Sequence, residues 1–197
     1  MDTRTIDTYD RGASYYSKKF TGIGSRVKDI ERAFVYVNKQ FPTTLELGCG
    51  DGRDAKEICK RTNRYIGIDA SKQLLNVARK RVSRATFYVA DIESYEFESG
   101  IDVVFAFASL LHVPRGKLKD VFKRAHKALN KGGIFYISTK EGIYNDGGAV
   151  VTDENWDRVF YLYSESDLRD LSCGYTVQYI NRQIRGKTKW LTFVIKK

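Results

Sequence analysis

The segment LELGCGDGR, residues 45–53, holds the residue types and spacing most suited to chemistry. Gly48, Gly50 and Gly52 alternate in it, so the backbone can turn tightly and approach a ligand closely. Two known phosphate loops are excluded. Position 53 is Arg53, where the dinucleotide fingerprint has glycine, and no Gly-Lys-Ser/Thr triplet follows, as a Walker loop requires. The glycines therefore predict a ligand-contacting turn of another kind.

Three carboxylates lie at the ends of three successive predicted strands. Glu46 lies just before the first glycine, where it would repel a pyrophosphate but favour an ammonium or sulfonium group. Asp69 comes about 20 positions after Gly48, the spacing at which a carboxylate accepts hydrogen bonds from ribose hydroxyls. Asp91 could accept from an exocyclic amine, such as that of adenine, while Ile92 packs on the ring. Together they predict a site for a cationic nucleoside without phosphates.

Each of these residues also has a plainer interpretation. Three alternating glycines exceed what an ordinary strand-to-helix turn needs, which favours ligand contact. Asp69 could belong only to the start of the next helix, and Asp91 could be an ordinary loop aspartate. Their positions directly after predicted strands favour the ligand-binding roles.

The elements that must position these residues are short apolar runs that alternate with amphipathic stretches. Expected strands cover 43–47, 65–68, 86–89, 102–107, 134–138, 175–180 and 190–195, and expected helices cover 51–61, 71–82, 114–129 and a stretch beginning at 164. Ser71 and Ser164 should cap the second and fourth helices, and Gly132 and Gly133 should stop the third. The last two strands, joined by a short polar link, should pair as a hairpin.

This alternation predicts an α/β fold, a three-layer αβα sandwich with its ligand beyond the carboxyl ends of the strands. A length of 197 residues, 42% of them hydrophobic, suits one folded domain and excludes a disordered chain. The 3 cysteines form no CxxC pair, which excludes a disulfide framework and a cysteine-based metal site. A polar N-terminal stretch and the lack of a membrane-length apolar run predict a cytoplasmic protein with no membrane partner.

Taken together, the motifs resemble those of class I S-adenosylmethionine-dependent methyltransferases, in their small single-domain bacterial-type branch. The matching positions are Glu46, Gly48, Gly50, Gly52, Asp69, Asp91, Ile92, Gly132 and Gly133, with SLLHVP at 109–114 as a further similarity. The resemblance implies a Rossmann-like seven-stranded sheet of order 3-2-1-4-5-7-6, with strand 7 antiparallel. We expect one domain over 1–197, with 1–40 as an N-terminal helical cap and 140–163 as a substrate-cover loop.

The resemblance also implies S-adenosyl-L-methionine as cofactor and S-adenosyl-L-homocysteine as product. The predicted cofactor-binding residues are Tyr9, Glu46, Gly48, Cys49, Gly50, Gly52, Asp69, Ala70, Asp91, Ile92, Phe107 and Ala108. Tyr9 is included because the segment around it resembles the N-terminal helix that covers the cofactor in this family. Phe107 and Ala108 should pass the methionine portion, and Cys49 is expected to pack rather than to react.

The acceptor is expected beside His112, which follows the fourth strand. A neutral imidazole there could deprotonate a hydroxyl or amine nucleophile; alternatively, His112 is a structural residue at a helix start. The residues expected to contact the acceptor are Tyr16, Lys140, Arg158, Tyr163 and Arg185. Among them, Lys140, Arg158 and Arg185 suit a carboxylate or phosphate, although the basic run of the closing hairpin could equally be a solvated face.

These residues predict an enzyme that transfers a methyl group to a small O- or N-nucleophile by in-line displacement, without a metal site. The net charge of +10 favours an anionic acceptor, because the predicted cofactor pocket is itself acidic. One alternative is an RNA (tRNA) methyltransferase, which the charge favours, although Phe107-Ala-Ser-Leu stands where a base-amine methylase has an Asn-Pro-Pro-Tyr-type motif. The other is a non-catalytic, cofactor-binding regulatory subunit. The sequence makes no prediction of oligomeric state.

Overall fold

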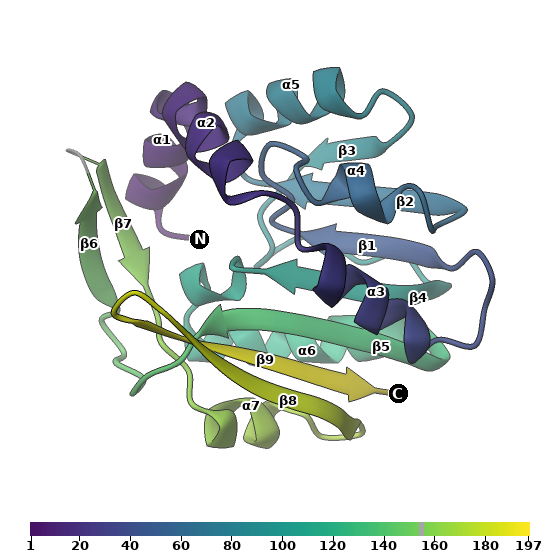
Figure 1. Ribbon diagram of the computed structural model, residues 1–197. Helices are drawn as coiled ribbons and strands as arrows, with labels where there is room; N and C mark the ends of the chain where they lie inside the picture. Colours follow the sequence, from purple (N-terminus) through teal and green to yellow (C-terminus); the bar gives the residue numbers. More distant parts are fainter. Residues whose placement is uncertain (154–155) are drawn as a thin grey trace.

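A seven-stranded sheet runs through the middle of the computed structural model, which describes residues 1–153 and 156–197 (Figure 1). Its strands are β1 (Thr43–Leu47), β2 (Arg64–Asp69), β3 (Thr86–Val89), β4 (Ile101–Phe107), β5 (Leu129–Lys140), β8 (Thr176–Arg185) and β9 (Thr188–Lys196). Their order is β3-β2-β1-β4-β5-β9-β8, and β9 is antiparallel to both of its neighbours. The predicted topology is confirmed, with the closing hairpin supplying its sixth and seventh strands.

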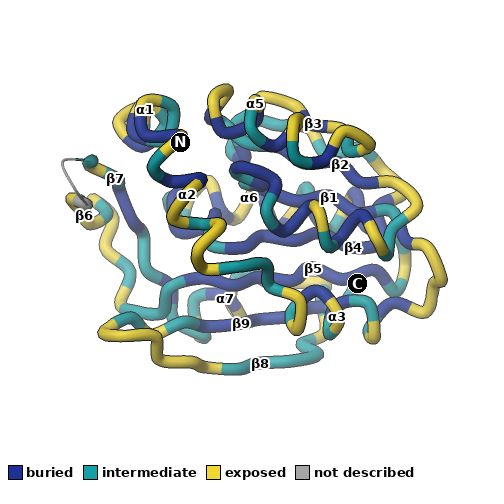
Figure 2. Tube along the Cα trace, turned by 45° about the horizontal axis from the view of Figure 1, so that its top comes forward, coloured by how far each residue is buried: buried dark blue, intermediate teal, exposed yellow. Residues whose placement is uncertain are grey.

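Helices cover both faces of the sheet: on one face α3 (Val27–Val35), α4 (Ala55–Ile58) and α5 (Lys72–Arg81), and on the other α6 (Arg115–Ala128) and α7 (Glu165–Leu171). Alternate side chains of β4 enter the two cores, Phe105 on the α3 side and Val104 on the α6 side. Because both faces are covered, β1, β4, β5 and β9 are buried along most of their length, and β4 is almost entirely apolar, whereas the edge strand β8 is more exposed (Figure 2).

Side-chain caps begin two of these helices as predicted. Ser71 Oγ accepts from Leu74 N before α5, and Ser164 with Asp167 forms a complete capping box before α7. The helix expected over 51–61 is only α4, because turns through the glycine loop use the residues before Ala55. The helix expected over 114–129 is confirmed as α6, but Gly132 and Gly133 do not stop it: α6 passes straight into β5, and both glycines lie within that strand.

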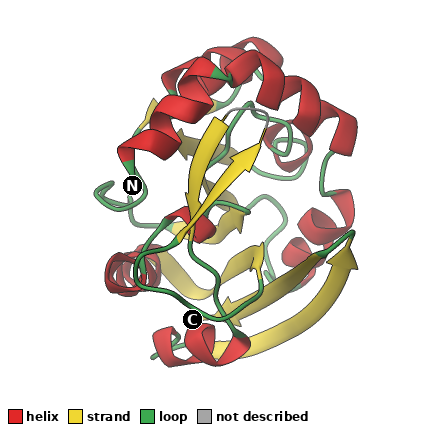
Figure 3. Cartoon of the chain, turned by 90° about the vertical axis from the view of Figure 1, so that its left-hand side faces the viewer, coloured by secondary structure: helices red, strands yellow, loops and turns green. Residues whose placement is uncertain are grey.

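Two N-terminal helices and a small hairpin lie at the carboxyl ends of the parallel strands, the end that faces the viewer in Figure 3. They are α1 (Thr3–Arg11), α2 (Ala13–Ile23) and the antiparallel pair β6 (Ala149–Asp153) and β7 (Trp156–Phe160). A 3₁₀ turn, η1 (Leu110–His112), packs against β7 of this hairpin. Tyr161 N, directly after β7, donates to Leu111 O of the turn at 2.7 Å.

The segments predicted as cap and cover have the following structure. Within the helical cap expected over 1–40, α1 and α2 lie over the strand ends, whereas Ile30 and Ala33 bury α3 against the sheet. The substrate cover expected as a loop over 140–163 contains the β6–β7 hairpin, which α1 holds: Val159 N donates to Thr5 Oγ1 at 2.9 Å and Thr8 Oγ1 donates to Asp157 O at 2.6 Å. Glu154 and Asn155 of this cover lie outside the described residues.

Candidate active site

A cavity of about 700 Å³ opens at the carboxyl ends of β1, β2 and β4, beneath α1, α2 and the β6–β7 hairpin. The predicted cofactor residues that line it are Tyr9, Glu46, Gly48, Cys49, Gly50, Asp69, Ala70, Ile92, Phe107 and Ala108. Gly52 and Asp91 do not line it. The cavity continues past His112 to Lys140, Arg158 and Arg185, so that the predicted cofactor and acceptor regions share one space.

The three glycines of the loop have different roles. All have positive φ, at +71°, +55° and +74° for Gly48, Gly50 and Gly52. A Cβ on Gly48 would lie 2.4 Å from Ser109 Cβ, and one on Gly52 would lie 3.0 Å from Ala78 Cβ, whereas nothing lies within 4 Å of a Cβ on Gly50. Gly48 and Gly52 thus allow the loop to pack, and Gly50 leaves room in the cavity wall.

Asp69 ties the glycine loop to the end of β2. Its Oδ2 accepts from Gly50 N and its Oδ1 accepts from Ser71 N, both at 2.8 Å. Burial raises the pKa of Asp69 to about 6, although the two backbone donors favour the ionised form. The carboxylate is therefore fixed in orientation at the cavity wall, as hydrogen bonds to ribose hydroxyls would require.

Glu46 lies at the same wall and is only 2% exposed. Tyr65 Oη donates to its Oε2 at 2.5 Å. Burial, together with the nearby Asp54, raises the pKa of Glu46 above its ordinary value. A cation bound beside Glu46 would favour the ionised form, which is the electrostatic role that the sequence predicts for this residue.

Arg26 lines the cavity and was not predicted from the sequence. Its backbone N and its Nη1 donate to Asp54 at 2.8 and 2.9 Å, and its guanidinium lies 5.2 Å from the centroid of the Phe107 ring. Burial lowers the pKa of Arg26 from its ordinary value, while Asp54 opposes this effect. No spacing distinguishes Arg26 among the many arginines of the chain; only its position before α3 brings it here.

Asp91 contacts the α-ammonium of Met1, which also lies 2.9 Å from Glu93 Oε1. Both residues of this predicted pair follow the end of β3, but only Ile92 lines the cavity wall. The contact of Asp91 with an adenine amine stays a prediction.

His112 lies at the junction of the two ends of the cavity, on η1, and is 5% exposed. Its Nδ1 is 2.9 Å from Val159 O, and its Nε2 is 3.1 Å from Tyr9 Oη. Burial lowers the pKa of His112 to about 3; the hydrogen bond with Val159 O opposes this shift, and the positive charges of Arg158 and Lys140 add smaller effects in the same direction as burial. The imidazole is therefore neutral near pH 7.

The end of the cavity where the sequence predicts the acceptor, here called the acceptor end, is rich in cations and aromatic rings. Lys140 Nζ lies 4.0 Å from the centroid of the Phe160 ring, and the Arg158 guanidinium lies 5.0 Å from the centroids of both Phe160 and Tyr16. Arg185 and Trp190 complete this end. Phe160 and Trp190 were not predicted, since aromatic residues in strands are more often core residues than ligand contacts.

Tyr163 does not belong to this set. It is fully buried, its Oη donates to Val113 O at 2.5 Å, and its ring stacks on Tyr144 with centroids 5.3 Å apart. Tyr163 was predicted as an acceptor contact because it ends the segment 140–163, which was expected to be a substrate-cover loop. In the structure the chain turns inward after the hairpin and places Tyr163 in the core.

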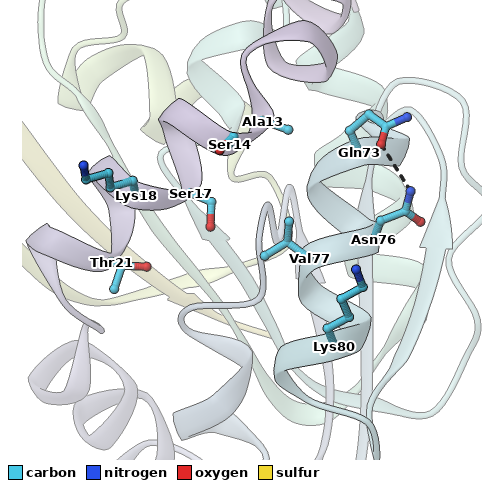
Figure 4. A pocket seen from close by; sticks show the side chains of 9 residues that line it. All are labelled: Ala13, Ser14, Ser17, Lys18, Thr21, Gln73, Asn76, Val77 and Lys80. Carbon is cyan, nitrogen blue, oxygen red and sulfur yellow. Dashed lines mark hydrogen bonds between the residues drawn. The ribbon is translucent and has the colours of Figure 1, made fainter.

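A second, open groove of about 620 Å³ lies between α2 and α5 (Figure 4). Asn76 Nδ2 donates to Gln73 Oε1 at 3.3 Å on one wall, and the side chain of Lys18 points away from α5 on the other (Figure 4). Within residues 1–153 and 156–197, no group of His, Cys, Asp or Glu is arranged to hold a metal ion. The helices of that same part of the chain include none long and apolar enough to cross a membrane.

Comparisons with known proteins agree with this geometry. Residues 44–133 match the family model of a methyltransferase domain. Trans-aconitate 2-methyltransferase of Afipia carboxidovorans is 31% identical over 108 residues, which cover 54% of this chain and 41% of that protein. Malonyl-[acyl-carrier protein] O-methyltransferase 1 of Ilyobacter polytropus is 26% identical over 141 residues, which cover 69% of this chain and 52% of that protein. The chain spans about half the length of the curated relatives it matches.

Solved structures share the fold. An S-adenosylmethionine-dependent methyltransferase from Clostridium acetobutylicum superposes with a TM-score of 0.74 at 17% identity, over 95% of this chain and 98% of that one. The 1,6-didemethyltoxoflavin-N1-methyltransferase of Burkholderia thailandensis, solved with 1,6-didemethyltoxoflavin and S-adenosylhomocysteine, gives 0.73 at 18% identity, over 98% and 87% of the two chains. Residues 44–133 thus match a methyltransferase domain, and the fold of the whole chain, with its sheet order, is that of S-adenosylmethionine-dependent methyltransferases of known structure.

Proposed function

We propose that this protein transfers the methyl group of S-adenosyl-L-methionine to a small, anionic nucleophile by in-line displacement. The observation that carries this proposal is the single cavity that joins the glycine loop to a cationic end. Gly50 and Asp69 lie at one end of it, and Lys140 and Arg158 lie at the other. One space can thus receive the methyl donor and the acceptor together, which is what an in-line reaction needs.

The residues of the loop end fit the cofactor. The open space before Gly50 admits a ligand against the backbone, and the fixed Asp69 carboxylate is placed to accept from ribose hydroxyls. Ile92 would pack on the base, and Glu46 and Arg26 would face the charged groups of the methionine portion. When bound, the cofactor supplies a methyl group activated by the sulfonium.

The rest of the site positions the reactants and keeps water away. We assign the cofactor-side cover to α1 and α2 and the acceptor-side cover to the β6–β7 hairpin. At the acceptor end, Lys140 and Arg158 would hold an anionic group while Phe160 and Trp190 supply apolar contact. Trans-aconitate, named for one relative, is a small organic anion of this kind, which supports the proposed acceptor class.

Calorimetric titration with S-adenosyl-L-methionine tests the cofactor end, with Asp69→Ala as the control. Equal binding by the two proteins would contradict the assignment of Asp69. Transfer of a radiolabelled methyl group is then measured with two acceptor pools, the small-molecule fraction of a bacterial extract and bulk tRNA. Label in the small-molecule fraction alone supports the proposal. Label in tRNA favours the RNA methyltransferase, and no label despite tight cofactor binding favours the regulatory subunit.

A further inference from the structure

His112 is held through both of its ring nitrogens. Nδ1 is 2.9 Å from the carbonyl oxygen of Val159, which can only accept a hydrogen bond, so Nδ1 carries the proton. Nε2 is then an acceptor, and Tyr9 Oη donates to it across 3.1 Å. The lone pair that a general base would offer to an acceptor is already used by Tyr9.

Tyr9 is in turn fixed by Arg158, whose Nη1 lies 3.2 Å from the same phenol oxygen. The hydrogen bonds therefore run in one direction, from Arg158 to Tyr9 to His112 to Val159 O. This series joins α1, η1 and β7 and holds the N-terminal helix against the hairpin. Its direct result is the orientation of Tyr9 at the cavity wall.

A proton moved through Tyr9 to His112 would create an imidazolium in an unfavourable place. Among residues 1–153 and 156–197, the charged or titratable groups that face the ring are Tyr9 from α1, Arg158 from β7 and Lys140 from β5. Two of these are cations, and the ring is buried. Both conditions oppose a third positive charge, in agreement with the low pKa of His112.

The carboxylates of the cavity wall are engaged at the other end. In the described part of the chain they come only from the glycine loop and the adjoining ends of β1 and β2. Asp51 Oδ2 lies 2.7 Å from Arg81 Nη1, Asp54 pairs with Arg26, and Asp69 accepts from two backbone N–H groups. None of these described carboxylates is a hydrogen-bond partner of His112, whose ring nitrogens are occupied by Tyr9 and Val159.

From this arrangement we propose that the nucleophile is a carboxylate oxygen of the acceptor, that the product is a methyl ester, and that His112 is a positioning residue for Tyr9. This rests on the proposed function and narrows its acceptor class. A carboxylate arrives deprotonated, so it needs no base, and Lys140 and Arg158 supply the charges that would bind it.

The bonds and charges balance without a further reactant. One carboxylate oxygen forms a bond to the methyl carbon as the carbon–sulfur bond breaks, and the electron pair of that bond stays on sulfur. The carboxylate loses its negative charge as it becomes an ester, and the sulfonium becomes a neutral thioether. No proton is released, which distinguishes this reaction from methylation of a neutral hydroxyl or amine.

The chemical stability of the product tests the proposal directly. Radiolabelled S-adenosyl-L-methionine and the small-molecule fraction of a bacterial extract are incubated with the protein, and the products are treated with alkali. Methyl esters release volatile labelled methanol, whereas methyl ethers and methylamines do not. As a matched control, the same fraction is used after its carboxylates have been converted to amides. We expect label that alkali releases and that the amidated fraction does not accept.

The outcomes separate this proposal from the proposed function. Label that alkali does not release overturns the carboxylate while the methyltransferase stands. Label in the amidated fraction likewise overturns the carboxylate as nucleophile, while the methyltransferase activity stands. Complete lack of label with both fractions contradicts the proposed function as well.

Two variants test the role of His112. His112→Gln keeps an acceptor toward Tyr9 but has no basic nitrogen, whereas His112→Ala keeps neither. If His112 only positions Tyr9, His112→Gln loses less than about 10-fold in kcat/KM, His112→Ala loses more, and wild type and His112→Gln have pH profiles of the same shape. A loss of about 100-fold or more in His112→Gln, with an ionisation present only in wild type, would identify His112 as a general base and overturn the proposal.

Discussion

The two ends of the cavity are built in different ways. At the loop end, backbone groups make the wall: Gly48 N and Cys49 N donate to Ile68 O, and Gly50 N donates to Asp69. At the acceptor end, side chains from distant elements make it, since Tyr9 and His112 are 103 positions apart and Tyr9 and Arg158 are 149 apart. The backbone at the ends of β1 and β2 makes one end, whereas the other needs side chains of α1 and the hairpin beside those of β5, β8 and β9.

This difference suggests a division of roles. A wall of backbone and glycine suits a ligand that never changes, because few substitutions can alter it. A wall of side chains on a cover can change its acceptor by single substitutions while the sheet remains intact. Substitutions at the loop end should therefore affect folding and cofactor binding, and those at the acceptor end should affect the acceptor.

The largest effect is expected at Gly48. A Cβ there would meet Ser109 Cβ at 2.4 Å in a residue with φ of +71°, so Gly48→Ala should lower the free energy of unfolding by about 2–4 kcal/mol. Gly50→Ala is the matched control, since its Cβ would have open space and only the strain of φ +55° remains. Its cost should be about 1 kcal/mol, with weakened cofactor binding as its main effect. Denaturant unfolding and calorimetry measure both, and equal destabilisation would contradict the distinction.

Asp69 should make the stability of the unligated protein depend on pH. Its pKa is about 6 in the folded chain against 3.8 for an ordinary aspartate, so ionisation costs more in the folded state. This contribution to stability is present below pH 3.8 and is lost as the pH rises through 6, by about 3 kcal/mol at most. Asp69→Asn should remove that fall in stability. Unfolding free energies between pH 4 and 7 test this, and parallel curves for the two proteins would refute it.

The difference between the two ends of the cavity also explains why the sequence predicts the loop end better than the acceptor end. The loop end follows from short-range patterns: a strand, a glycine turn and a carboxylate at the next strand end, and all three were placed correctly in the fold. The acceptor end depends on long-range docking, so Tyr163 was misplaced and Phe160 was missed. No local pattern shows that Tyr163 Oη reaches Val113 O, or that Arg26 reaches Asp54.

Substitutions that weaken the docking of α1 on the hairpin should lower the free energy of unfolding less than substitutions in the glycine loop. Thr5 Oγ1 accepts from the buried Val159 N, so Thr5→Val leaves that N–H without its partner at a cost of about 1–2 kcal/mol. Thr3→Val, on the exposed side of the same helix, is the control. Because Val159 also holds His112, Thr5→Val should raise the KM for the acceptor more than the Kd for the cofactor. An equal rise in both constants would show that α1 does not serve the acceptor end in particular.

The smallest effects concern two basic residues of β8 that contribute to the net charge of +10. One of them, Arg182, forms ion pairs, and the other, Arg185, lines the cavity. Arg182 is about half exposed and pairs with Glu141 and Glu165, so Arg182→Ala should cost less than about 1 kcal/mol and leave the KM for the acceptor unchanged. Arg185, three positions further along the strand, lines the cavity. Arg185→Ala should therefore raise that KM by about 3- to 10-fold with the same stability. Steady-state kinetics of the two variants decide whether the acceptor uses the cavity as far as β8 or only as far as Arg158. If both arginines behave as Arg182 is expected to, the charge of β8 belongs to the solvated surface, and Lys140 and Arg158 alone recognise the acceptor.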